Sequence, residues 1–232
     1  MDVLGDAITR ERRSSDVALE VPAVGRRYDY RRFCTSAWKV GNFLRHLGVR
    51  PGVGVSIADD PLPEPVLTLY GVGLLGGVVR FGPDGVVDDG QRALVVPASE
   101  IDDYEVGPST KRVGYGGSPD NPDVSHFERD VWSENPTEPP DRVEPDAPLL
   151  STGAETYSHA AVIDAAESVV EAYDLGPGRT VAIDGPFTGP CVVVAGLIAP
   201  IVAGGAVAIG PDASGDVTVG PEGDVVPGDV PL

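Results

Sequence analysis

The sequence predicts an α/β fold, in which two pseudo-symmetric Rossmann-like subdomains carry mostly parallel sheets flanked by helices. Residues 47–84 and residues 175–212 follow one order: a glycine turn, a short apolar strand, a helix, a Gly-Gly pair and a second strand. A helical segment precedes each copy. Alternating strands and helices of this length favour βαβ units. Two copies are too few for a solenoid, so a doubly wound architecture is expected.

The first subdomain is expected at residues 1–115. Apolar or alternating runs predict strands at residues 17–21, 53–57, 78–81 and 93–96. Apolar residues at helical spacing predict a helix at residues 30–47, which ends at Gly48. A second helix is expected at residues 64–75, with prolines near its start, where the missing N–H is tolerated.

Residues 116–148 change in character, because prolines alternate with acidic residues. This composition predicts an extended linker between the subdomains. Phe127 and Trp132 are the large apolar residues in it, and we expect both to anchor the linker to a domain surface.

The second subdomain is expected at residues 149–210, with a helix at residues 158–173 and a strand at residues 180–183. Residues 191–210 carry no charge, which raises the possibility of a membrane span. A proline and several glycines inside the run favour a buried helix, a turn and a buried strand instead. The tail, residues 211–232, is rich in Gly, Pro and Asp and is expected to add an edge hairpin or stay partly loose.

Acidic residues outnumber basic ones by 36 to 17, and the net charge is −19. Lys39 and Lys111 are the only lysines. This balance predicts that the protein works in the cytoplasm of a salt-accumulating, haloarchaeal cell. There, K⁺ at high concentration screens the repulsion among the acidic side chains. An acidic mesophilic protein from a high-GC genome is the alternative. No basic nucleic-acid footprint exists. Cys34 and Cys191 lie in apolar stretches and are expected to be buried thiols.

Gly71, Gly73 and Gly76 spell the spacing of a dinucleotide fingerprint. That motif works only between a first strand and the helix that follows it. Here it falls inside and at the end of a predicted helix, which favours packing glycines. The three histidines lack metal-ligand spacing, so no metal site is expected.

Several phrases, taken in order, resemble the N-terminal part of the adenylate-forming superfamily of acyl-CoA synthetases, luciferases and peptide-synthetase adenylation domains. The phrase LGVRPG at residues 47–52 resembles the family's L-G-V-x-P-G. Residues 16–33 resemble its opening strand and helix start, residues 64–83 its P-E-…-A-G-A-V segment, and residues 149–210 the part from the phosphate loop onward. The resemblance implies ATP or AMP, with Mg²⁺, as ligands.

The family's phosphate loop, T-S-G-T-T-G-x-P-K-G, corresponds here to a shortened stretch. By resemblance the nucleotide-binding residues of this degenerate loop are, in order, Ser151, Thr152, Gly153 and Thr156. The lysine is missing, and Glu155 places a negative charge beside the expected polyphosphate, which is unfavourable. His159, Phe187 and Thr188 are the candidates for a residual pocket.

These departures predict a degenerate, non-catalytic relative with no catalytic residue of its own. We expect it to hold a nucleotide or acyl ligand weakly, or to pair with a partner as a homodimer or heteromer. The first alternative is one subunit of a split AMP-forming acyl-CoA ligase. The second alternative is a dinucleotide-binding protein. Neither a nucleic acid nor a membrane is expected as a partner.

Overall fold

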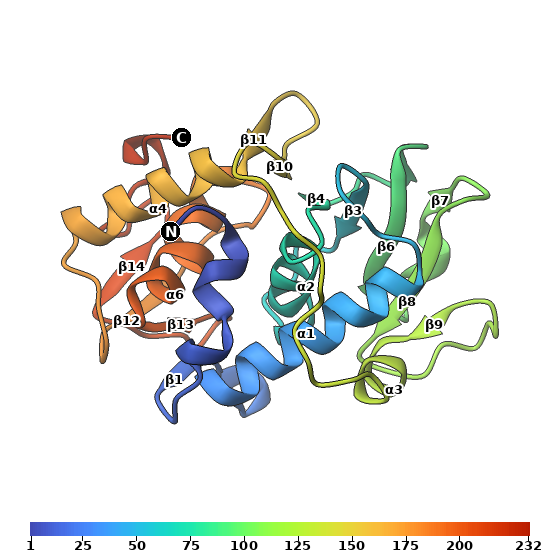
Figure 1. Ribbon diagram of the computed structural model, residues 1–232, viewed down its shortest axis with the longest axis horizontal. Coiled ribbons are helices and arrows are strands. Elements are labelled where there is room, and N and C mark those ends of the chain that lie inside the picture. Colours follow the sequence, from blue (N-terminus) through green and yellow to red (C-terminus); the bar gives the residue numbers. More distant parts are fainter.

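Two sheets enclose a set of helices in the computed structural model, which describes residues 1–232 (Figure 1). The five-stranded sheet has the order β14 (Val217–Val219), β12 (Thr180–Ile183), β13 (Ala206–Ala208), β1 (Val17–Val21) and β2 (Arg26–Asp29). The seven-stranded sheet has the order β11 (Thr156–Ser158), β10 (Pro148–Ser151), β4 (Val78–Phe81), β3 (Gly54–Ile57), β6 (Gln91–Pro97), β8 (Lys111–Tyr115) and β9 (Ser125–His126). A small third sheet pairs β5 (Val86–Val87) with β7 (Glu105–Val106). The mixed, mostly parallel α/β class predicted from the repeat is confirmed.

The helices follow the predicted order. They are α1 (Tyr30–His46), α2 (Pro63–Gly73), α3 (Phe127–Trp132), α4 (His159–Ala172), α5 (Pro190–Val192), a π-helix (Val193–Ile198) and α6 (Ala199–Ala203). Short 3₁₀ turns span Leu4–Ile8, Arg10–Arg12, Pro22–Val24, Ile101–Asp103 and Pro227–Asp229. Asp29 caps α1 by accepting the N–H of Arg32, and Ser158 caps α4 by accepting the N–H of Ala161. Both copies therefore begin their first helix directly after a hairpin with a side-chain cap, which fixes where the helix starts.

The two hairpins that precede these helices are exchanged between the sheets. Strand β1 lies parallel to β13, with Leu19 opposite Val207, and β2 extends that sheet. Strand β10 lies parallel to β4, with Leu150 opposite Val79, and β11 extends the other sheet. Each sheet therefore takes strands from both sequence repeats, and a single connected cluster of 65 buried residues runs through both.

The uncharged run of residues 191–210 folds as α5, the π-helix and α6, followed by β13. Gly196 lies where this helix crosses the sheet, because a Cβ there would come within 2.7 Å of the Ile183 side chain. The hydroxyl of Tyr70 donates to the carbonyl of Leu197 over 2.8 Å, which satisfies a group in the irregular π turn. The run is thus buried inside the protein. None of the helices has both the length and the apolar character that crossing a bilayer requires.

Residues 116–148 contain β9 and α3, and the part after α3 lies against α1. The side-chain amide of Asn42 donates to the carbonyls of Asn135 and Thr137 and so holds the stretch to the helix. Phe127 is buried, as predicted. The same prediction was wrong for Trp132, whose surface is 79% exposed, because α3 is short and its last residue lies beyond the surface that Phe127 contacts.

The tail contributes β14, which pairs parallel with β12, with Val181 opposite Val217. The expected edge hairpin does not form, because the chain crosses from the end of β13 to the start of β14. Asp216 accepts the N–H of Thr180 at this crossing. Sheet order β14-β12-β13 therefore reproduces the order β6-β3-β4 of the other sheet.

Candidate functional site

The stretch that resembles a phosphate loop forms the tight turn between β10 and β11, where Ser151 lies opposite Thr156. The N–H of Thr152 donates to the carbonyl of Glu155 over 3.0 Å. The N–H of Gly153 donates to Ser151 Oγ, and the N–H of Glu155 donates to Thr152 Oγ1, each over 3.1 Å. Phosphate binding needs free backbone donors that converge on the anion. Here the turn itself occupies three of its donors.

Glu155 lies at the exposed tip of this turn. Its Oε2 accepts a hydrogen bond from the Tyr157 hydroxyl over 2.7 Å. That hydrogen bond raises the pKa of Tyr157 above its ordinary value, since the charged carboxylate favours the protonated phenol. The tip therefore presents a carboxylate and a phenol, and both groups are exposed to a ligand that approaches the turn.

Arg80, which the sequence analysis missed, supplies a cation beside the turn. It lies on β4, the strand next to β10, and a Cβ at Gly153 would lie 3.3 Å from its guanidinium carbon. Gly153 has a φ of +89°, a left-handed conformation that glycine adopts without strain. Arg80 also forms an ion pair with Asp88. Its signal in the sequence is an arginine near the carboxyl end of a predicted strand.

His159 begins α4 but is fully buried. Its Nδ1 accepts the backbone N–H of Leu4 over 3.1 Å, so the ring is neutral with its proton on Nε2. Burial lowers the pKa of His159 from its ordinary value to about 4. The structure therefore buries this residue beneath the N-terminal segment.

Phe187 and Thr188 lie in the loop after β12. Phe187 packs edge-on against Phe81, with 5.6 Å between ring centroids, and its N–H donates to Asp59 Oδ1 over 2.7 Å. Thr188 is exposed, and its methyl group lies over Gly82. Both residues therefore fasten the loop after β12 onto the other sheet, at the ends of β3 and β4.

A cavity of about 740 Å³ opens at the carboxyl end of β12. Its lining includes Ala182, Ile183 and Thr218 of the sheet and residues of the loops that follow β12 and β13. Asp59 and Asp184 line it, and its wall contains no Lys, Arg or His. Ligand sites of α/β sheets are found at this edge. The two carboxylates nevertheless oppose a polyphosphate.

Phe187 is the one candidate residue that belongs to the lining of this cavity. The four residues of the degenerate loop stay together in the β10–β11 turn, apart from the cavity lining. The structure holds no group of three or more His, Cys, Asp or Glu side chains that could bind a metal ion.

Both cysteines are free thiols. Cys34 is buried, and burial raises the pKa of its thiol to about 11, so it stays protonated at neutral pH. Cys191 is partly buried, and burial raises its pKa as well. Neither thiol has the depressed pKa of a nucleophile, and the buried-thiol prediction holds fully for Cys34.

No protein-family profile and no curated protein matches the sequence. Solved structures do match its fold. The anthranilate CoA ligase AuaEII, in complex with anthranoyl-AMP, aligns with a TM-score of 0.76 at 19% identity, over 91% of this chain and 45% of that one. The N-terminal domain of FACL13 from Mycobacterium tuberculosis aligns with a TM-score of 0.72 at 15% identity, over 90% of this chain and 57% of that one.

The nonribosomal peptide synthetase FmoA3 aligns with a TM-score of 0.74 at 18% identity, and this chain covers 23% of it. An AMPPNP-bound form of FmoA3 also matches. The chain therefore has the fold found in the N-terminal part of adenylate-forming enzymes. It spans about half, or less, of the length of these solved chains.

Proposed function

We propose that this protein is a degenerate, non-catalytic relative of the adenylate-forming enzymes, which acts by binding a nucleotide or acyl ligand weakly or by pairing with a partner chain. One observation carries this proposal: the turn from Ser151 to Thr156 uses its own backbone donors. Three of its N–H groups bond within the turn. A polyphosphate would have to break these bonds before the backbone could hold it, and it would meet the Glu155 carboxylate.

The cations near the expected site support the same conclusion. Arg80 is the cation beside the turn, and Asp88 already pairs with it. The neighbouring cavity contributes carboxylates alone as charged groups. Catalysis of phosphoryl or adenylyl transfer depends on electrostatic stabilisation of developing negative charge. The charged groups around the β10–β11 turn and the cavity at β12 provide too little positive charge for that role. Weak binding of AMP or of an acyl group does not require such stabilisation.

A split AMP-forming acyl-CoA ligase is the second candidate. The observation that favours it is the coverage: this chain aligns with 45% of AuaEII and 57% of the FACL13 N-terminal domain. In that arrangement a second polypeptide would complete the site. The proposal of a partner, either a second copy or a different chain, rests on the same observation.

The alternative of a dinucleotide-binding protein, which was based on the glycine spacing, is not the function that we favour. Gly71 and Gly73 lie within α2. A Cβ at Gly71 would come within 2.9 Å of the Gly41 backbone nitrogen, and one at Gly73 within 2.8 Å of the Leu4 side chain. These glycines therefore let α2 pack closely against α1 and the N-terminal segment, which fully accounts for them.

We also propose that the protein works in a salt-rich cytoplasm, because its net charge of −19 requires screening by cations such as K⁺. The test of the proposed function follows from this. The purified chain, in molar KCl, is assayed for ATP–pyrophosphate exchange with a panel of carboxylic acids. We expect no exchange. Carboxylate-dependent exchange that a Ser151→Ala/Thr152→Ala variant abolishes would overturn the proposal. Exchange that appears only when a second polypeptide is added would instead establish the split ligase.

A further inference from the structure

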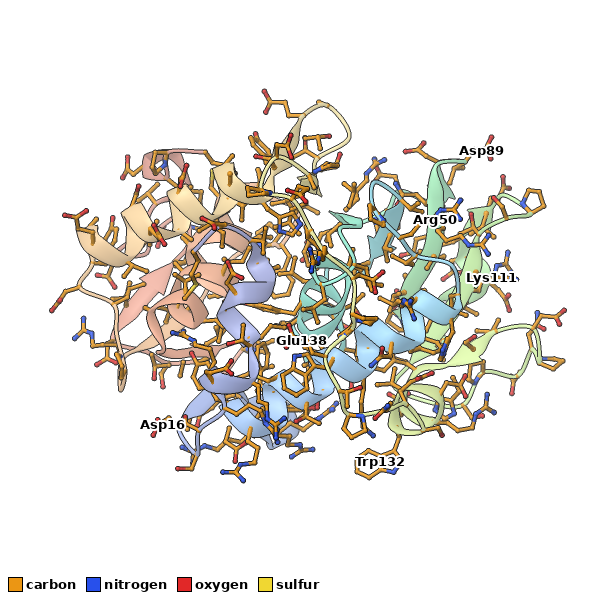
Figure 2. All side chains as sticks on the ribbon, in the orientation of Figure 1. Asp16, Arg50, Asp89, Lys111, Trp132 and Glu138 are labelled. Atoms are coloured by element: carbon orange, nitrogen blue, oxygen red, sulfur yellow. The ribbon has the colours of Figure 1, made fainter.

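A second cavity, of about 570 Å³, lies between β2, the first half of α1 and α3. Its apolar lining comes from Leu67, Phe127 and Val131, each of which is less than 10% exposed. Trp132 stands at its edge, and Figure 2 shows the indole pointing outward from the end of α3. We call this cavity the α1–α3 groove. It shares no residue with the β10–β11 turn or with the cavity at β12.

Positive charge gathers in the α1–α3 groove, although acidic residues predominate in the chain as a whole. Four cationic side chains line it that form no ion pair with a carboxylate: Arg13, Arg31, Arg32 and Lys39. The lining of the groove holds five cationic side chains against three acidic ones. Four unpaired cations in one groove therefore leave a local excess of positive charge.

The acidic residues of the groove are engaged elsewhere. Glu64 is buried and pairs with Arg26. Asp29 accepts the N–H of Arg32 at the start of α1, over 2.7 Å. Glu128 accepts the N–H of Gly116, also over 2.7 Å, and lies 3.2 Å from a ring nitrogen of His126. Asp29 and Glu128 keep their negative charge, but the cations of the lining outnumber its carboxylates, so an anion from solution would meet a net positive charge.

Aromatic rings accompany these cations. The Arg32 guanidinium lies 4.4 Å from the Tyr28 ring centroid, and Lys39 Nζ lies 5.0 Å from the Trp132 ring centroid. Lys39 Nζ also donates to the Trp132 carbonyl over 2.6 Å, which holds the lysine against the indole. Trp132 is 79% exposed. A large exposed indole next to a fixed ammonium offers one surface for stacking and one charge for an anion.

We propose that the α1–α3 groove is a binding site for a small organic phosphate with a flat aromatic body. The guanidinium groups of Arg31 and Arg32 and the Lys39 ammonium receive the phosphate, since guanidinium forks match phosphate oxygens. The aromatic body lies on Trp132 and the apolar lining. A volume of about 570 Å³ lies within the range of small-molecule sites. This inference goes beyond the proposed function, which concerns a different region of the chain.

The test uses 1-naphthyl phosphate in molar KCl, with inorganic phosphate and 1-naphthol as separate probes of charge and ring. Binding is measured by calorimetry and by the two tryptophan indole N–H signals in NMR. Trp38 is buried and its N–H donates to the carbonyl of Ile8 over 3.0 Å, so its signal serves as the internal reference. We expect 1-naphthyl phosphate to shift the Trp132 signal and to bind about tenfold or more tightly than either separate probe.

Two substitutions and a matched control locate the site. We expect Lys39→Gln and Trp132→Ala each to weaken binding about fivefold to tenfold. Lys111→Gln removes the other lysine, which is exposed on β8 and lies well apart from Trp132 in Figure 2, and should leave binding unchanged. No binding of 1-naphthyl phosphate, or equal losses in all three variants, would overturn the proposal. An acidic peptide that shifts Trp132 where the phosphate does not would overturn it too, by assigning the groove to a protein partner.

Discussion

The Nδ1 atom of His159 accepts the backbone N–H of Leu4 over 3.1 Å, across 155 residues of sequence. The first residues of the chain are thereby tied to the start of α4. Leu4 is fully buried beside this bond, and the amino group of Met1 pairs with Glu167 on the same helix, over 3.0 Å. The N-terminal segment is therefore part of the packed core, and a neutral imidazole holds it.

The first prediction concerns pH. Because burial lowers the pKa of His159 to about 4 from an ordinary 6.5, the unfolded chain takes up a proton at a higher pH than the folded one. The stability that this group contributes is complete above pH 6.5 and is lost as the pH falls toward 4. The loss amounts to about 3 kcal/mol. We expect His159→Gln to melt with a weaker dependence on pH between 7 and about 4.5 in constant molar KCl.

The glutamine amide can accept the Leu4 N–H without titrating, so the comparison isolates the proton. Asp6 is the nearby carboxylate that opposes the shift in the His159 pKa, and Asp6→Asn should steepen the dependence slightly. Equal pH dependence of the melting temperature in wild type and His159→Gln would show that this histidine plays no part in acid sensitivity.

The second prediction concerns the π-helix. Tyr70 is fully buried, and its hydroxyl donates to the Leu197 carbonyl over 2.8 Å. Tyr70→Phe keeps the packing of the ring but leaves that carbonyl without its partner, which should lower the free energy of unfolding by about 1–3 kcal/mol. Tyr157→Phe, at an exposed hydroxyl, is the control and should change it by less than about 0.5 kcal/mol. Chemical denaturation in constant KCl measures both, and an unchanged Tyr70→Phe midpoint would contradict the argument.

The third prediction concerns nucleotide affinity. We expect ATP to bind more weakly than about 1 mM, which corresponds to roughly −4 kcal/mol. Glu155→Gly should barely improve this, since the turn stays closed on its own donors. Replacing Ser151 or Thr152 with Ala should have little effect on function. Arg80→Gln should abolish any residual ATP binding, because Arg80 is the cation beside Gly153. Calorimetry with ATP and AMP measures these constants, and micromolar ATP binding by the wild type would refute the closed-turn argument.

The fourth prediction concerns salt. With 36 acidic and 17 basic residues, repulsion inside the fold should grow as cations are removed. Dialysis from molar KCl to about 0.1 M, where the Debye length is about 10 Å, should cause loss of secondary structure and a lower melting temperature. Circular dichroism follows the change, with sucrose in place of KCl as the control for non-ionic stabilisation. Full retention of structure at the lower concentration would remove the basis for a halophilic origin.

The fifth prediction concerns assembly. The chain mass is 24.1 kDa, which is the mass expected of a monomer. We expect a homodimer or a stable complex with another chain, measured by light scattering after size exclusion in molar KCl and by native co-purification. A strictly monomeric species in both measurements would count against a partner.

Local patterning was sufficient for most helices and for several strands, but it did not predict β2, β8, β10 and β11. The period of apolar residues located α1 and α4 within a residue or two, with Gly48 marking the end of the first helix, and the strand predicted at residues 180–183 is β12. The repeated order of elements also predicted that the molecule would hold two similar α/β units. These features depend on residues close in sequence, so a single sequence suffices to read them.

Contacts between distant segments decided the rest. The exchange of hairpins, the Leu4–His159 bond and the placement of Arg80 beside Gly153 each join residues more than 70 positions apart. The apolar pattern of a strand predicts that the strand is buried, but it does not predict which edge of which sheet the strand will join. Trp132 is a large apolar residue of the kind that usually packs against a domain, yet its side chain is exposed. The length and direction of a helix decide which of its side chains reach the core. The chain's local pattern thus defined several of its elements and their class, while long-range packing determined which sheet each hairpin joins and which cation lies beside the β10–β11 turn.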